Sequence, residues 1–132
     1  MNLILSSYAD NAKASEIPVT ISVTATDFSR FQITDLCSLL SNALDNTIRA
    51  CSQIPYTEGR YIHLKVYEKN EQLCINLAKS YEEQPIFENN IPISQRSGHG
   101  YGVQSIISVV DKYQGIYGFF AENGEFRFQA SL

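Results

Sequence analysis

The chain has few of the residues on which metal and redox chemistry usually depend. Its 132 residues include two histidines, His63 and His99, three cysteines and no tryptophan. Two histidines leave little room for a metal site built on imidazole ligands. The cysteines, Cys37, Cys51 and Cys74, form no Cys-x-x-Cys pair and lie in or beside apolar runs. This pattern predicts buried structural thiols in a reducing compartment.

A surplus of positive charge and a long apolar segment are also missing. Ten lysines and arginines stand against 14 aspartates and glutamates, which gives a net charge of −4. That balance argues against general nucleic-acid binding and leaves room only for a local anion site. No run reaches the roughly 18 apolar residues of a membrane span. The N-terminus also lacks the basic start and cleavage site of a signal peptide. We therefore expect one soluble domain over 1–132 that is not inserted in a membrane.

The spacing of apolar residues predicts an α+β domain, with helices covering one face of a mostly antiparallel, mixed sheet in a two-layer α/β sandwich. Thr34 would cap the long helix at its start, and Gly115 would end the last helix. In chain order the sequence predicts a helix at 3–14, a strand at 19–25, a helix at 35–51, a hairpin over 61–78, a loop at 80–100, a helix directly after Gly102 and a hairpin over 117–130.

Two asparagines on the long predicted helix form the first candidate site. Asn42 and Asn46 are four residues apart and so lie one above the other on one face. Arg49 belongs to the same polar side. Two carboxamide oxygens in this arrangement suit Mg²⁺, which keeps several waters and needs few protein ligands. An ordinary solvated helix face is the competing interpretation.

A glycine triplet directly before the last helix forms the second candidate site. Gly98, Gly100 and Gly102 alternate with His99 and Tyr101 at the end of an unusually long loop. Glycines let the backbone approach a ligand, and free N–H groups at a helix start favour anions. The triplet is neither a Rossmann fingerprint nor a P-loop, because no strand precedes it and Gly-Lys-Ser/Thr is missing.

Two charged or titratable groups lie close to these glycines. Arg96 stands two residues before the first glycine, where it could pair with a phosphate. His99 is expected to be a loop or lid residue, not a base or a metal ligand. His63, in the middle of a predicted strand, is expected to be a surface or packing residue.

These features together resemble the ATP-binding domain of the GHKL superfamily, which has the Bergerat fold and includes gyrase, Hsp90, MutL and the sensor histidine kinases. More narrowly, the chain is similar to the catalytic domains of peptide-pheromone receptor kinases of the AgrC type. The matching runs are LILSSYADNAKASEIPVTISV (3–23), DLCSLLSNALDNTIRAC (35–51), ENNIPISQRSGHGYGVQSI (88–106) and DKYQG (111–115).

The resemblance implies a role for each candidate residue. Asn46 would be the Mg²⁺ ligand, and Asn42 takes the place where ATP-hydrolysing members carry a general-base glutamate. Gly100 and Gly102 would offer backbone N–H groups to the phosphates of ATP, and Arg96 would reach the γ-phosphate. The remaining nucleotide-binding positions implied are Arg49, Lys79, Gly98, His99 and Tyr101.

One position departs from the family pattern. Most histidine kinases accept the adenine amino group with an aspartate, and the AgrC-type branch has asparagine there. Here the matching run is Ala78-Lys79-Ser80-Tyr81. Lysine only donates hydrogen bonds, so it cannot accept from an amino group. A GHKL module that has lost ATP, or a free-standing anti-sigma-factor kinase, are the alternatives to a sensor kinase domain.

As a whole, the resemblance implies the catalytic domain of a two-component sensor histidine kinase that acts in quorum sensing. Such a domain binds ATP and Mg²⁺ and passes the γ-phosphate to a histidine on a separate dimerisation domain of the same kinase. A response regulator receives the phosphate next. The chain would then be a cytoplasmic fragment of a longer, membrane-bound receptor, with little activity when isolated.

Overall fold

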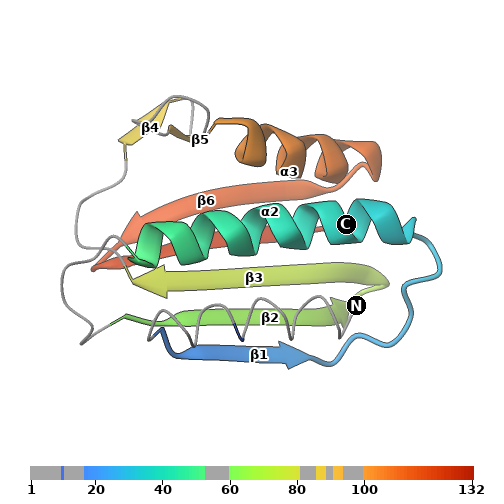
Figure 1. The fold of residues 1–132 in the computed structure, drawn as a ribbon. Helices are drawn as coiled ribbons and strands as arrows, with labels where there is room; N and C mark the ends of the chain where they lie inside the picture. The colour runs from blue at the N-terminus through green and yellow to red at the C-terminus, as the bar shows by residue number, and fades with distance from the viewer. Residues whose placement is uncertain (1–9, 11–16, 53–59, 81–85, 89–90, 94–99) are drawn as a thin grey trace.

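A computed structural model describes residues 10, 17–52, 60–80, 86–88, 91–93 and 100–132. The elements are β1 (Val19–Val23), α2 (Ile33–Ser52), β2 (Ile62–Lys69), β3 (Gln72–Ser80), β4 (Ile86–Glu88), β5 (Ile91–Ile93), α3 (Gly100–Lys112), β6 (Ile116–Glu122) and β7 (Glu125–Ser131). Five strands form one sheet in the order β1-β2-β3-β7-β6, and β4 pairs with β5 separately. Helices α2 and α3 lie on one face of the five-stranded sheet (Figure 1).

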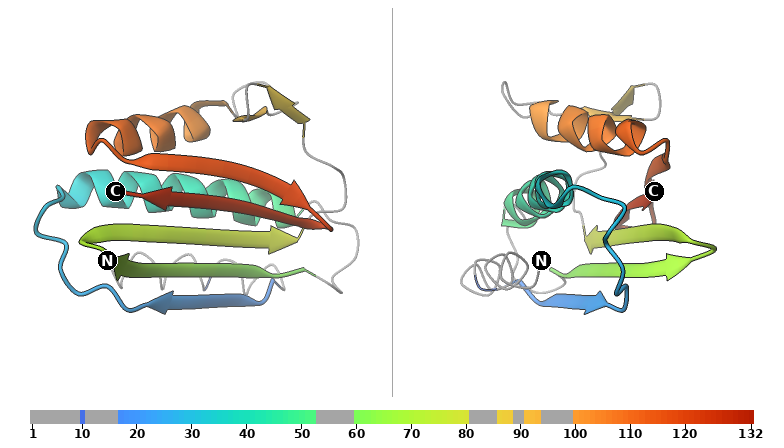
Figure 2. Two further views of the ribbon diagram at one scale, coloured as in Figure 1. Left: turned by 180° about the vertical axis from the view of Figure 1, so that it is seen from behind. Right: turned by 90° about the vertical axis from the view of Figure 1, so that its right-hand side faces the viewer.

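Alternating burial along the strands explains why the helices cover only one face. In β2, Ile62, Leu64 and Val66 are at most 2% exposed, whereas His63 and Lys65 between them are exposed. Successive side chains of a strand point to opposite faces, so the apolar set packs under α2 and the polar set faces away from the helices. The two further views in Figure 2 show this second face without a described helix on it.

Strand pairing confirms the predicted α+β class. β1 runs parallel to β2, and the remaining pairs in the sheet are antiparallel. The two hairpins that the sequence predicts are present as β2–β3 and β6–β7. Asn123 and Gly124 turn the second hairpin with φ values of 53° and 78°, the backbone that a two-residue hairpin turn requires.

Helix α2 carries the predicted apolar stripe but begins earlier than the sequence suggested. Leu36, Leu40 and Leu44 are each 1% exposed and form the centre of the core. The carbonyl of Gln32 accepts hydrogen bonds from the backbone N–H groups of Asp35 and Leu36. Gln32 therefore occupies the cap position, and the assignment of Thr34 to that position is wrong.

The end of α3 also differs in detail from the prediction. The left-handed residue after the helix is Gln114, with φ of 57°, and Gly115 follows it. The N–H of Gln114 donates to the carbonyl of Asp111 (3.0 Å), and that of Gly115 donates to the carbonyl of Val110 (2.9 Å). This is the double hydrogen-bond pattern of a Schellman motif with glutamine at the left-handed position. Gly115 does not supply the turn that ends the helix.

Other predictions meet the structure only in part. The predicted loop at 80–100 contains the short hairpin β4–β5. Within the predicted helix at 3–14 only Asp10, which is helical, belongs to the described residues. The predicted burial of the cysteines is wrong for Cys37 and Cys74, which are half-buried. The side chain of Cys51 lies outside the described part.

Candidate functional site

The two asparagines both belong to α2, four residues apart. Asn42 is half-buried, and its Nδ2 group donates to the carbonyl of Ser38 at 2.8 Å. That hydrogen bond orients the carboxamide and leaves its oxygen as the group's acceptor. The side chains of Asn46 and Arg49 lie outside the described part, although both residues are helical. Among the described groups, Asn42 thus provides the kind of neutral oxygen that Mg²⁺ accepts.

Thr47 is a polar residue on this helix that the sequence did not single out as part of the core. It is 4% exposed, and its hydroxyl donates to the carbonyl of Ala43 at 2.6 Å. The hydroxyl is therefore satisfied within the helix and needs no partner from another element.

The glycines occupy the first turn of α3. The helix begins at Gly100, so Gly100 and Gly102 are part of the helix and do not precede it. The first N–H groups of an α-helix have no acceptor within the helix and can donate to an anion. No acidic residue lies in this turn to compete with such an anion. Arg96, Gly98 and His99 lie outside the described residues, and so does the side chain of Tyr101.

Antiparallel packing brings the first turn of α3 level with the asparagines. Asp35 in the first turn of α2 bonds to Lys112 at the end of α3, and the two helices run in opposite directions (Figure 1). α3 has 13 residues, and the same count along α2 from Asp35 reaches Thr47. Both helices rise by about 1.5 Å per residue. Gly100 therefore lies level with the turn of α2 that contains Asn46.

Lys79 stands at the end of β3 on the helix-covered face. Its ammonium group lies over the ring of Phe126, with Nζ 5.1 Å from the centroid. Phe87 of β4 stacks on the same ring at 6.3 Å. A cation on an aromatic face is stabilised by the ring quadrupole. The sequence did not single out Phe87, because it lies in the segment predicted as a loop.

His63 lies away from these groups, on the face of the sheet that no described helix covers. Its ring packs against that of Tyr61, with centroids 5.0 Å apart. A hollow of about 100 Å³ lies beside it over Ala78, between Lys65 and Arg127. The prediction of a surface or packing role for His63 is confirmed.

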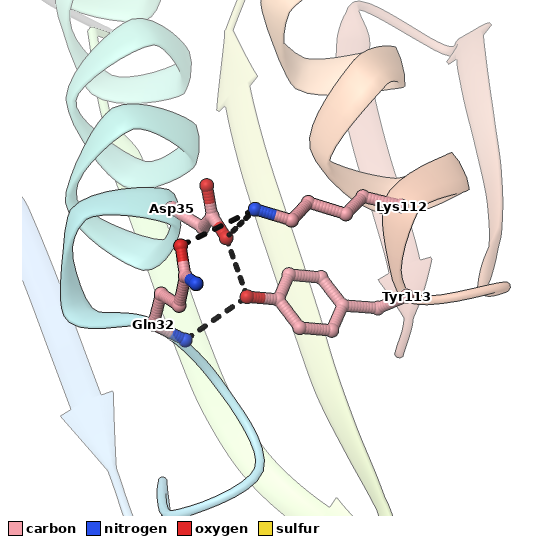
Figure 3. Close-up of polar contacts among 4 residues, drawn as sticks. All are labelled: Gln32, Asp35, Lys112 and Tyr113. Carbon is pink, nitrogen blue, oxygen red and sulfur yellow. Dashed lines mark hydrogen bonds and ion pairs between the residues drawn. The ribbon is translucent and has the colours of Figure 1, made fainter.

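A polar cluster at the opposite end of the two helices joins α2 to α3, and we name it the helix clamp (Figure 3). Its members are Gln32, Asp35, Lys112 and Tyr113. Oδ2 of Asp35 accepts from Lys112 Nζ at 2.8 Å and from the hydroxyl of Tyr113. The Tyr113 hydroxyl in turn accepts from the backbone N–H of Gln32 at 2.9 Å. The sequence contained part of this cluster in the DKYQG run but offered no sign of its partner Asp35.

The helix clamp shifts the ionisation of both of its charged groups. Hydrogen bonds from Lys112 and then Tyr113 hold the pKa of Asp35 below its ordinary value of 3.8. The hydrogen bond to Asp35 raises the pKa of Lys112 above 10.5. The Asp35 side chain is 18% exposed and that of Lys112 is 50% exposed, so solvent screens the pair in part.

Asp35→Asn should therefore destabilise the domain in a pH-dependent way. A carboxylate with a lowered folded-state pKa adds stability above its unfolded-state pKa and loses it as the pH falls through the folded-state value. We expect a lower urea midpoint for Asp35→Asn than for the wild type at pH 7, and a gap that closes below pH 3.8. Urea denaturation across this range measures both midpoints.

Asp111→Asn is the control, since Asp111 is an exposed carboxylate in the last turn of α3, next to Lys112. Its urea midpoint should stay near that of the wild type. A gap between Asp35→Asn and the wild type that persists unchanged at low pH would contradict the assigned ionisation.

A model of the GHKL domain family matches residues 31–132, which is most of the chain. The chain belongs to the GHKL domain family. The fold is shared with solved structures of histidine kinases. The nucleotide-free ThkA catalytic domain matches with a TM-score of 0.75 and 15% identity, over 99% of this chain and 89% of that one. A mycobacterial sensor histidine kinase, MprB, matches with a TM-score of 0.70 and 17% identity, over 100% of this chain and 93% of that one. Identities this low show the fold alone.

The histidine kinase AdeS of Acinetobacter baumannii is also similar, with a TM-score of 0.68 and 11% identity. The match covers 99% of this GHKL domain and 61% of the AdeS chain, so the domain spans about three fifths of that structure. No protein of curated function matches the chain. Among the described residues, no helix is long and apolar enough to cross a membrane, and no three His, Cys, Asp or Glu residues cluster as metal ligands.

Proposed function

We propose that this GHKL domain is the catalytic domain of a sensor histidine kinase of the AgrC type, which binds Mg–ATP and donates the γ-phosphate to a histidine on a separate dimerisation domain. One observation supports this most: the antiparallel helices bring the first turn of α3 level with the asparagines of α2. A helix start with free N–H groups thus lies level with the turn of α2 that carries them. The full-length kinase ShkA, which shares the fold at 18% identity, has been solved with AMPPNP.

In this proposal the chain's own groups position the triphosphate and neutralise its charge, which is most of what phosphoryl transfer requires. Gly100 and Gly102 donate backbone N–H groups to the phosphates, and Arg96 pairs with the terminal one. Asn46 gives its amide oxygen to the Mg²⁺ ion, which supplies charge stabilisation when bound. Asn42 is a neutral amide and cannot act as a general base towards water, which favours transfer over hydrolysis.

Calorimetric titration with a non-hydrolysable ATP analogue tests the proposal directly. We expect saturable binding that depends on added Mg²⁺. Lack of saturation at millimolar analogue, in a sample shown to be folded, would contradict the kinase assignment. It would favour a GHKL module that no longer binds ATP. We further propose that the partner histidine and then a response regulator receive the phosphate, and that the domain acts within a membrane-bound receptor; a phosphotransfer assay with the dimerisation domain supplied tests the first of these steps.

The identity and place of Lys79 favour the alternative function, a GHKL module that no longer binds ATP. Its ammonium group lies over Phe126 on the helix-covered face, at the position where the family places an acceptor for the adenine amino group. Lys79→Asn replaces a donor-only side chain with one that can accept. If the lysine is a defect, the variant should bind the ATP analogue about tenfold more tightly, equivalent to about 1.4 kcal/mol.

The same titration, run on both proteins, measures this difference. Phe126 lies under the ammonium group, so the melting temperature of Lys79→Asn is recorded alongside to separate a change in affinity from a change in stability. Unchanged or weaker binding would argue that the lysine has a role of its own.

A further inference from the structure

We infer that the helix clamp acts as a pivot that sets where the first turn of α3 lies against α2, and that it thereby controls nucleotide affinity from the far end of the helices. The effect on affinity rests on the proposed function, whereas the effect on the position of α3 does not.

The hydrogen bonds of the helix clamp fix the orientation of α3 relative to α2. The Tyr113 hydroxyl is used twice, as donor to Asp35 and as acceptor from the backbone N–H of Gln32. Lys112 Nζ also reaches two acceptors, Asp35 Oδ2 at 2.8 Å and Gln32 Oε1 at 3.3 Å. Hydrogen bonds lose strength quickly as their angles change, so four of them oppose rotation of α3 relative to α2.

The tyrosine ring is itself held in place. It packs edge-on against Phe31, with centroids 4.8 Å apart, in the segment that leads into α2. Directly after the clamp, the backbone of Gly115 lies so close to Ser131 that a side chain there would collide with the carbonyl oxygen. The C-terminal end of α3 is therefore the fixed end of the helix.

Elsewhere, apolar side chains of the two helices meet in the core. Leu36 and Leu40 on α2 and Ile106 and Val110 on α3 belong to one buried cluster. Apolar burial has no direction, so such contacts tolerate small tilts that hydrogen bonds resist. A tilt of about 3° at the clamp moves the other end of a helix of roughly 18 Å by about 1 Å. A misplacement of this size can cost up to about 100-fold where groups must be positioned.

Tyr113→Phe tests the inference, because it deletes the hydroxyl and keeps the ring that packs on Phe31. In the nucleotide-free protein we expect the amide resonances of Gly100 and Gly102 to shift, although they lie at the opposite end of α3. With the Mg²⁺-bound ATP analogue we expect affinity to fall about three- to tenfold, measured where both proteins are fully folded. Asp35→Asn should shift the same two amide resonances.

Tyr67→Phe is the matched control. Its hydroxyl accepts from Asn76 Nδ2 at 3.3 Å between β2 and β3, away from the helix clamp. It should leave both glycine resonances and the affinity at wild-type values. Glycine resonances that do not move in Tyr113→Phe would overturn the pivot, whether or not nucleotide binds. Moved resonances with unchanged affinity would overturn its control of the site, and absence of binding by the wild type would instead overturn the proposed function.

Discussion

Asn46→Asp and Gly100→Ala should each weaken binding of the Mg²⁺-bound ATP analogue by about tenfold or more, equivalent to at least about 1.4 kcal/mol. The aspartate keeps an oxygen for the metal ion but loses the amide donor and adds a negative charge beside the polyphosphate. The alanine places a methyl group in the first turn of α3, where in the proposed site the phosphates would approach the backbone N–H groups closely.

Titration calorimetry at fixed Mg²⁺ measures both variants against the wild type. His63→Ala is the control, because His63 lies on the face of the sheet opposite the helices and packs on Tyr61. It should bind like the wild type. Equal affinity in all three variants would refute the assignment of the site to α2 and α3, even if the domain binds ATP elsewhere.

Gly115→Ala should lower the free energy of unfolding by about 1–3 kcal/mol, the usual cost of forcing extra atoms into a packed region. A Cβ at this position would lie 2.4 Å from the carbonyl oxygen of Ser131 and 3.2 Å from Cα of Leu132. Both are backbone atoms at the end of β7, where Leu132 exchanges two hydrogen bonds with Leu73. They cannot retreat without breaking that pairing. Urea denaturation gives the difference directly.

Gly118→Ala provides the comparison within β6. A Cβ there would meet only the ring of Phe120, 2.8 Å away, and that side chain is 46% exposed and able to turn aside. Its effect should stay within about 0.5 kcal/mol, as for ordinary surface substitutions. If the two alanine variants lose the same stability, steric collision at Gly115 is not the cause.

Local patterns predicted the elements of this domain well, because local patterns create them. Leucines repeated at every fourth residue predicted α2, and alternating apolar residues predicted β2, β3 and the last hairpin. The cap at Gln32 was missed for a physical reason: the Tyr113 hydroxyl that binds its N–H lies 81 residues away in the chain. Gln114 was missed because glycine is the usual residue in the left-handed conformation after a helix, and the neighbouring Gly115 drew the assignment.

The candidate site was predictable only in part. The spacing of Asn42 and Asn46 and the glycine triplet stand out in the sequence, since each is a short-range feature. That they lie at the same level of the fold could not be predicted, because it depends on the antiparallel packing of α2 and α3. The helix clamp that sets this packing joins Asp35 to Lys112 over 77 residues. Lys79 was noticed only as a departure from a family pattern, and its contact with Phe126 comes from the pairing of β3 with β7.

That pairing has a consequence for how the domain accommodates insertions. Ser80 at the end of β3 and Glu125 at the start of β7 are register partners, and β6 pairs with β7 in the same sheet, so the chain between Ser80 and Ile116 leaves the sheet and returns to it at β6. The entropy lost on closing such an excursion grows only with the logarithm of its length, about 0.6 kcal/mol for each doubling. Residues can therefore be added or removed ahead of α3 at small cost to β3 and β7. The fold thus separates the length of the chain between β3 and α3 from the stability of the sheet.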